Sequence, residues 1–350
     1  MKHAIILIGL LLSSCYISEE LPPDQMIWEY ELPENVGLDQ FRLAELNNKI
    51  KFLEFEQLAG LIIIKDDNLV YENYYLENDR STLNTLDGAS MAITVAAIGI
   101  AVENGLFSLD DKIQDYLPEY DDVFKDNNNK TFITIRHLLL DKSGLSWSFN
   151  DYFDMIQTNN WVRYILEKPM QAPAGLQFNP NEAIGLLLAK IIESKSGLTF
   201  NEFVNQNIFK SLGISNFTID QDSEGNYDGA TGINLSLLDF TKIGYLMLEE
   251  GIWNGRRVLD PNFIEEATSI QTDVSATIGS GYSWTRFGNN FEDFFGINHE
   301  DFYFITGDLG QHLYIIPSQK MVVVIDAENF FFGFGNPSLN LLTEISYMIQ

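Results

Sequence analysis

Ser90 is the side chain whose type and position best suit covalent chemistry. It begins a long apolar segment that ends before Gly105, and such a segment predicts a buried helix. A serine hydroxyl in the first turn of a helix can attack a carbonyl carbon when a nearby base takes its proton. The residue three positions further on is Ile93, which cannot act as that base. A small residue in the first turn of a buried helix is also an ordinary structural choice, so Ser90 has a structural and a chemical interpretation.

An acidic loop that starts at Asp220 is the best candidate for a metal site. Acids occupy its first, third and fifth positions and Gly225 the sixth, a spacing that resembles a calcium-binding loop. The twelfth position is Thr231, where such loops carry a bidentate glutamate. Among the histidines, His137 lies at the start of an apolar helix pattern, and His299 and His312 are isolated along the chain. Because the bidentate glutamate is missing, we expect an acidic surface loop at Asp220. Because no zinc-ligand spacing such as HExxH occurs, we expect no metal and no cofactor.

Cys15 is the only cysteine of the chain. It follows Lys2, the apolar run 4–12 and two small serines, and a run of this length is too short to span a bilayer as a helix. The pattern is typical of an export signal, and Leu12–Cys15 resembles a bacterial lipobox, in which lipid is attached to the cysteine sulfur. We predict a signal segment over 1–15 and a protein anchored through lipid on Cys15 to a bacterial envelope membrane, on its periplasmic or outer face. The alternative is a plain signal peptide that ends in a chance cysteine.

The charge balance narrows the range of partners. Of 350 residues, 50 are Asp or Glu and 21 are Lys or Arg, which gives a formal net charge of −29. A chain this acidic repels phosphate backbones, so nucleic-acid binding is not expected. It also repels anionic lipid surfaces, so attachment to a membrane requires a covalent or hydrophobic device.

Regular patterns begin after an irregular N-terminal segment. Residues 16–45 contain three prolines and many acids and predict an acidic tether. Two apolar and aromatic runs between residues 61 and 75 flank a polar turn, which predicts a β-hairpin. The helix that follows is apolar on almost every face and is closed by Gly105, a residue that readily adopts the left-handed conformation.

The C-terminal part returns to strand patterns. Residues 302–305, 312–316 and 321–326 predict strands, and Pro337 opens a last amphipathic helix. Between the two strand-rich ends, capping patterns at Thr199 and Ser236 predict helices. We therefore expect one sheet built from both ends of a domain over 46–350, with a helical lobe over about 88–290.

Four groups of motifs then match one enzyme family. They are Asp110–Ile113 with Tyr116–Tyr120, Thr134–Leu139 with Ser143–Leu145, Thr231–Gly244, and Trp253–Arg256. Together they resemble stretches of the serine β-lactamase-related hydrolases, which include penicillin-binding-protein-like and class C β-lactamase-like enzymes. The resemblance runs from about residue 58 to the end. It implies an α/β (α+β) fold of the β-lactamase/transpeptidase type, with an antiparallel sheet from both chain ends packed with helices and a helical lobe.

The resemblance also implies where the catalytic pair of the family would lie. In these relatives a Ser-x-x-Lys pair opens the buried helix, and the serine stands at a fixed distance from the glycine that ends it. Counting back from Gly105 places the serine position at Gly88 and the lysine position at Met91. Glycine has no side chain and a thioether carries no transferable proton, so neither residue can do the family's chemistry.

The two other catalytic elements of the family are also altered. The Tyr-x-Asn loop aligns with Asn179 and Asn181, so the phenol is lost while the second amide is kept. The Lys- or His-x-Gly strand edge aligns with Ile305, Thr306 and Gly307, which removes the cation. Asp308 follows, beside the strand-edge N–H that would face an oxyanion, where a carboxylate opposes developing negative charge.

Three functions remain open from the sequence. The first is an exported pseudo-hydrolase whose cleft binds a peptidoglycan-like peptide, an ester or an envelope protein. The second is an active hydrolase of esterase, peptidase or β-lactamase type that uses Ser90 with an unrecognised base. The third is a structural lipoprotein with an occluded cleft. Because three separate elements have lost their chemistry inside a well-matched frame, we favour a non-catalytic binding protein.

Overall fold

The computed structural model describes residues 28–51, 57–126, 128–181, 183–288, 302–327 and 337–349. The predictions for Cys15, for the signal segment and for His299 lie outside these ranges.

One antiparallel sheet joins the two ends of the chain. Its strands, in spatial order, are β2 (Asn68–Tyr74), β1 (Leu58–Lys65), β13 (Met321–Ala327), β12 (His312–Ile316), β11 (Tyr303–Thr306), β10 (Thr285–Phe287), β9 (Ile278–Ser280) and β8 (Thr272–Asp273). The neighbouring strands β1 and β13 pair with Ile62 opposite Val324. Side chains alternate across β1, so Ile62 and Ile64 enter one core while Leu61 and Ile63 enter the other. The predicted hairpin, the predicted C-terminal strands and their shared sheet are confirmed.

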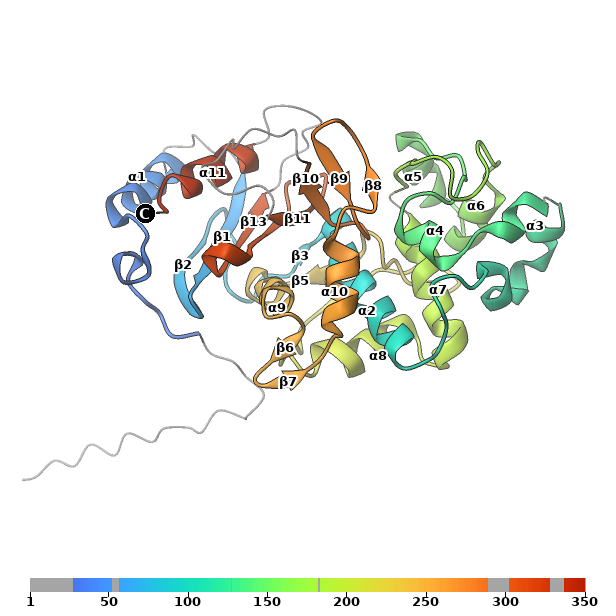
Figure 1. The fold of residues 1–350 in the computed structure, drawn as a ribbon, viewed down its shortest axis with the longest axis horizontal. Coiled ribbons are helices and arrows are strands. Elements are labelled where there is room, and N and C mark those ends of the chain that lie inside the picture. Colours follow the sequence, from blue (N-terminus) through green and yellow to red (C-terminus); the bar gives the residue numbers. More distant parts are fainter. Residues whose placement is uncertain are drawn as a thin grey trace, which may run out of the picture.

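Helices cover both faces of this sheet. On one face α1 (Gln40–Lys51) and α11 (Pro337–Ser346) lie together, as Figure 1 shows, and Leu46 and Leu342 are buried there. On the other face α9 (Leu237–Leu248) packs against β1, β12 and β13. The sheet is therefore the middle layer of an α/β sandwich, which explains why its central strands are buried on both sides.

The buried helix predicted from the sequence is α2 (Met91–Glu103), preceded by a 3₁₀ turn, η2 (Asp87–Ser90). It is apolar on every face because it is surrounded by α7, α8 and α10. Gly105 ends it with φ +69°, as expected. The turn η2 at the start of this helix contacts β11 of the sheet.

The remaining elements lie beside the sheet. The helices are α3 (Asp121–Asp126), α4 (Ile135–Leu139), α5 (Phe149–Met155), α6 (Trp161–Glu167), α7 (Ile184–Ser196), α8 (Phe200–Val204) and α10 (Pro261–Thr268). The minor strands are β3 (Asn84–Thr85), β4 (Thr218–Ile219), β5 (Ile233–Leu235), β6 (Ile252–Trp253) and β7 (Arg256–Arg257). The helical lobe is narrower than the predicted range 88–290. Strands β8 to β10 extend the large sheet by backbone pairing, and α9 packs on the sheet through buried residues such as Phe240 and Ile243.

The predicted tether is shorter than residues 16–45. Trp28 is buried, and its ring lies 5.6 Å from that of Tyr245 and 6.1 Å from that of Trp253, both in edge-to-face geometry. A 3₁₀ turn (Pro33–Val36) and α1 follow. Residues 28–45 therefore belong to the folded domain. The proline-rich composition of this segment does not predict that Trp28 packs against two aromatic residues of the domain.

Candidate ligand-binding cleft at the end of β11

Gly88 lies directly against the strand edge that the family uses. A Cβ atom built on Gly88 would stand 3.0 Å from the carbonyl oxygen of Thr306 and 3.5 Å from the Cα of Gly307. The first turn of the buried helix and the third family element are therefore adjacent in space. This proximity favours the register in which Gly88, and not Ser90, occupies the nucleophile position.

Ser90 is fully buried and faces the core. Its Oγ accepts a hydrogen bond of 3.2 Å from the backbone N–H of Ile233 in β5, and Ser90 does not line the cleft described below. A hydroxyl without solvent access cannot meet an external carbonyl carbon. The geometry favours the structural interpretation of this serine.

The other degenerate positions are used for packing and for hydrogen bonds within the chain. Met91 and Ile305 are buried in the core that contains α2. The side-chain amide of Asn179 donates to the carbonyl oxygen of Leu145 at 3.1 Å. Asn181 is buried, its Oδ1 accepts from the backbone N–H of Ala183, and its Nδ2 has no hydrogen-bond partner among the described residues. These residues supply no base and no cation to the cleft.

The carboxylate of Asp87 accepts hydrogen bonds from backbone N–H groups that follow β11. Its backbone has φ +47°, an unusual conformation for a residue other than glycine. Its Oδ2 accepts hydrogen bonds from the backbone N–H groups of Asp308, at 2.5 Å, and of Leu309, at 3.3 Å. A carboxylate oxygen of the protein thus occupies a donor that would face an oxyanion in an acyl-transfer enzyme. Nothing in the local sequence pattern around Asp87 relates it to β11.

An open cleft of about 400 Å³ lies between this strand edge and the helical side of the molecule. It is lined by Thr85, Asp87, Gly88, Phe149, Tyr152, Phe153, Pro180, Asp220, Thr231, Thr306, Asp308 and Leu309. The aromatic residues come from α5, which lies among the helices at the far side of the molecule from β1 and β2 (Figure 1). Of the predicted site residues, the cleft brings together Gly88 and Thr306, whereas Asn179, Met91 and Ile305 do not line it. The sequence patterns do not predict that α5 and Asp220 line the cleft.

The polar groups of the cleft form a short hydrogen-bonded chain. The hydroxyl of Tyr152 lies 3.2 Å from Oγ1 of Thr231, which donates to Oδ2 of Asp228 at 2.8 Å. Burial raises the pKa of the Tyr152 phenol and also that of the Asp228 carboxyl. A phenol whose pKa is raised stays protonated near neutral pH, so Tyr152 is not a general base that could replace the lost tyrosine.

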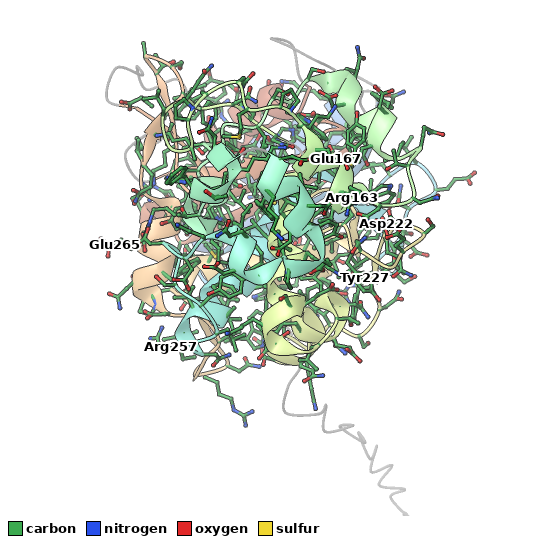
Figure 2. The ribbon with its side chains drawn as sticks, turned by 90° about the vertical axis from the view of Figure 1, so that its right-hand side faces the viewer. Arg163, Glu167, Asp222, Tyr227, Arg257 and Glu265 are labelled. Atoms are coloured by element: carbon green, nitrogen blue, oxygen red, sulfur yellow. The ribbon has the colours of Figure 1, made fainter. Side chains whose placement is uncertain are left out.

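One acid of the loop, Asp222, has both of its carboxylate oxygens in hydrogen bonds. Oδ1 of Asp222 accepts from the backbone N–H groups of Glu224 and Asn226, and Oδ2 accepts from the N–H of Trp161 at the start of α6. Figure 2 shows Asp222 beside α6, whose Arg163 is also labelled. Among the described residues no group of three or more His, Cys, Asp or Glu side chains could hold a metal ion. Asp222 therefore acts as a turn-forming residue.

Asp141, close to the cleft, is expected to make the stability of the protein depend on pH. Its Oδ1 accepts from the backbone N–H of Asn181, and burial raises the pKa of its carboxyl from 3.8 to about 7. Between these two pKa values the folded state holds a proton that the unfolded state releases, so the free energy of unfolding falls as pH rises from 3.8 to about 7. We expect a fall of about 2 kcal/mol, because solvent around the partly exposed side chain weakens the effect. Asp141→Asn should remove this loss, since asparagine keeps the acceptor and tolerates the φ of +53°.

Urea denaturation of this variant between pH 4 and pH 8 checks the expectation. The Asp141→Asn variant should be more stable than the parent at pH 8 and should differ least from it at pH 4. Asp154→Asn, at an exposed position of α5, is the matched control and should follow the parent curve. Parallel curves for Asp141→Asn and the parent protein would contradict the assignment.

Comparisons with known proteins identify the family and the fold of the chain. The sequence profile described as Beta-lactamase matches residues 56–331. An uncharacterized protein of Alkalihalophilus pseudofirmus is 25% identical over 356 residues, which cover 88% of this chain and 94% of that protein.

Among solved structures, similar folds include a Bacillus anthracis protein described provisionally as a 6-aminohexanoate-dimer hydrolase. It has a TM-score of 0.76 and 19% identity and covers 93% of this chain and 88% of its own. The penicillin binding protein of Bacillus halodurans has a TM-score of 0.68 and 17% identity and covers 86% and 99%. At these identities the two structures show a shared fold.

Proposed function

The chain belongs to the Beta-lactamase family, and we propose that it is a non-catalytic member that binds a ligand or partner at the cell envelope. In this proposal the protein is exported and held at a bacterial membrane by lipid on Cys15. Its cleft recognises a peptidoglycan-like peptide, an ester or an envelope protein without forming a covalent bond to it.

One observation carries the chemical part of the proposal. Gly88, which takes the nucleophile position in the register that the resemblance implies, lies against Thr306, and the neighbouring Asp87 carboxylate accepts a hydrogen bond from the N–H of Asp308. Acyl transfer needs an attacking side chain and free donors for the developing oxyanion. The attacking side chain is missing, and the negatively charged Asp87 carboxylate occupies one of the donors.

The alternative is a hydrolase that uses Ser90, and the arrangement of the core gives it little support. The side chain of Ser90 is buried and its Oγ is bonded to β5. The third hypothesis, a structural lipoprotein with an occluded cleft, is disfavoured because the cleft is open and has a volume of about 400 Å³. Covalent labelling with a fluorophosphonate tests the proposal, because a serine hydrolase with a working nucleophile takes up one probe molecule per chain.

The lipid anchor is tested by Cys15→Ala. Among the described residues no helix is long and apolar enough to cross a membrane. With an overall charge of −29, the exported chain has no electrostatic attraction to anionic lipid, so the lipid on Cys15 should supply most of its membrane affinity. We expect the substituted protein to move from the membrane fraction to the soluble fraction after cell fractionation. Ser13→Ala keeps a small residue before the cysteine and should remain membrane-bound. Equal retention of Cys15→Ala and the parent would contradict the anchor.

A further inference from the structure

One wall of the cleft is aromatic. Phe149, Tyr152 and Phe153 of α5 all line it, and Phe149 and Phe153 are each 44% exposed although they are large apolar side chains. The rings of Phe149 and Phe153 meet edge to face at 5.1 Å, and those of Tyr152 and Phe153 at 5.9 Å. A group of exposed rings at a cavity costs hydrophobic free energy unless a ligand covers it, and aromatic ring faces attract cations.

The opposite side of the cleft is negatively charged and lacks a counter-ion. Asp87, Asp220 and Asp308 line it from three different segments, and none of them forms an ion pair with a described residue. No Lys, Arg or His is among the described residues that line the cleft. Burial, and the charge of nearby Asp87, raise the pKa of the Asp308 carboxyl, and burial raises the pKa of Asp220. A cation in the cleft would stabilise the charged form of both.

We infer that this cleft binds a small organic cation, an ammonium group carried on an apolar body about the size of one ring. The inference rests on the proposed binding function and specifies its ligand. The aromatic wall and the unpaired carboxylates independently favour positive charge, and a cavity of about 400 Å³ suits a ligand of this size. The same carboxylates disfavour an anionic ligand.

The test compares three benzyl compounds that differ in charge. Calorimetric titration of the full-length protein with benzyltrimethylammonium, benzyl alcohol and phenylacetate should give an affinity for the cation at least about tenfold above the other two. Asp220→Asn combined with Asp308→Asn should weaken cation binding about fivefold to tenfold, and Phe153→Leu about threefold. Asp273→Asn, an exposed carboxylate of β8 outside the cleft, is the matched control and should change nothing.

Several results would overturn the inference. They are phenylacetate binding as tightly as the cation, no cation binding at millimolar concentration, or unchanged cation affinity in the double variant. The thermal midpoint of each variant shows whether it is folded. If the protein also remains unlabelled by a fluorophosphonate, the non-catalytic proposal stands and only the ligand class is wrong. If it is labelled but still prefers the cation, the proposed lack of catalysis fails and the ligand class stands.

Discussion

After incubation with a fluorophosphonate or a penicillin, the protein is expected to keep its unmodified intact mass. Gly88 offers no nucleophile, Met91 no base, Asn179 no phenol and Ile305 no cation. Members of a catalytic triad act as a unit, and losing one typically costs about four orders of magnitude in rate. With four positions changed, no acyl- or phosphonyl-enzyme should accumulate. Intact-mass spectrometry measures this directly.

Two variants make the result decisive. Gly88→Ser restores a hydroxyl at the strand edge but should also stay unmodified, because Met91 accepts no proton and Asp87 still occupies the N–H of Asp308. Ser90→Ala should behave like the parent. A stoichiometric adduct on the parent that disappears in Ser90→Ala would refute the non-catalytic proposal and make Ser90 the nucleophile.

Gly185→Val is expected to destabilise the protein by about 3 kcal/mol or more, the upper range for overpacking of a core. Gly185 is buried in the first turn of α7, where a Cβ atom would stand 2.6 Å from the backbone N and Cα of Ala230. Backbone atoms cannot rotate away as a side chain could, so α7 or the loop before β5 has to move. This loop carries Thr231 of the cleft and is held by Oγ1 of Thr94, which donates to the carbonyl oxygen of Gly229 at 2.6 Å.

Urea unfolding at one pH measures the free-energy difference. Ser194→Val introduces the same side chain at an exposed position of the same helix and should change stability by less than about 0.5 kcal/mol, because serine and valine have similar helix propensities. A Gly185→Val variant within 1 kcal/mol of the parent would show that α7 and this loop are not closely packed.

Much of the framework is determined by local patterns in the sequence. The hairpin of β1 and β2, the buried α2 ending at Gly105, the three C-terminal strands and the last helix are all predicted correctly, because each depends on apolar periodicity and on a terminating residue. The Thr199 cap is also confirmed, with Glu202 bonded back to it. The nucleophile position at Gly88 is implied by the family resemblance, by counting back from Gly105, and stays a prediction.

The tertiary structure decided the properties that depend on residues distant in sequence. Asp87 meets the N–H of Asp308 more than two hundred residues away, and the aromatic wall of α5 faces the strand edge only after the chain has folded. Ser90 is distinguished from a nucleophile by burial against Ile233, which helical periodicity cannot reveal when every face of the helix is apolar. Trp28 likewise joins the domain through Tyr245 and Trp253. A local pattern fixes which face of an element is apolar, whereas the side chains that meet across a cleft are set by how the elements pack.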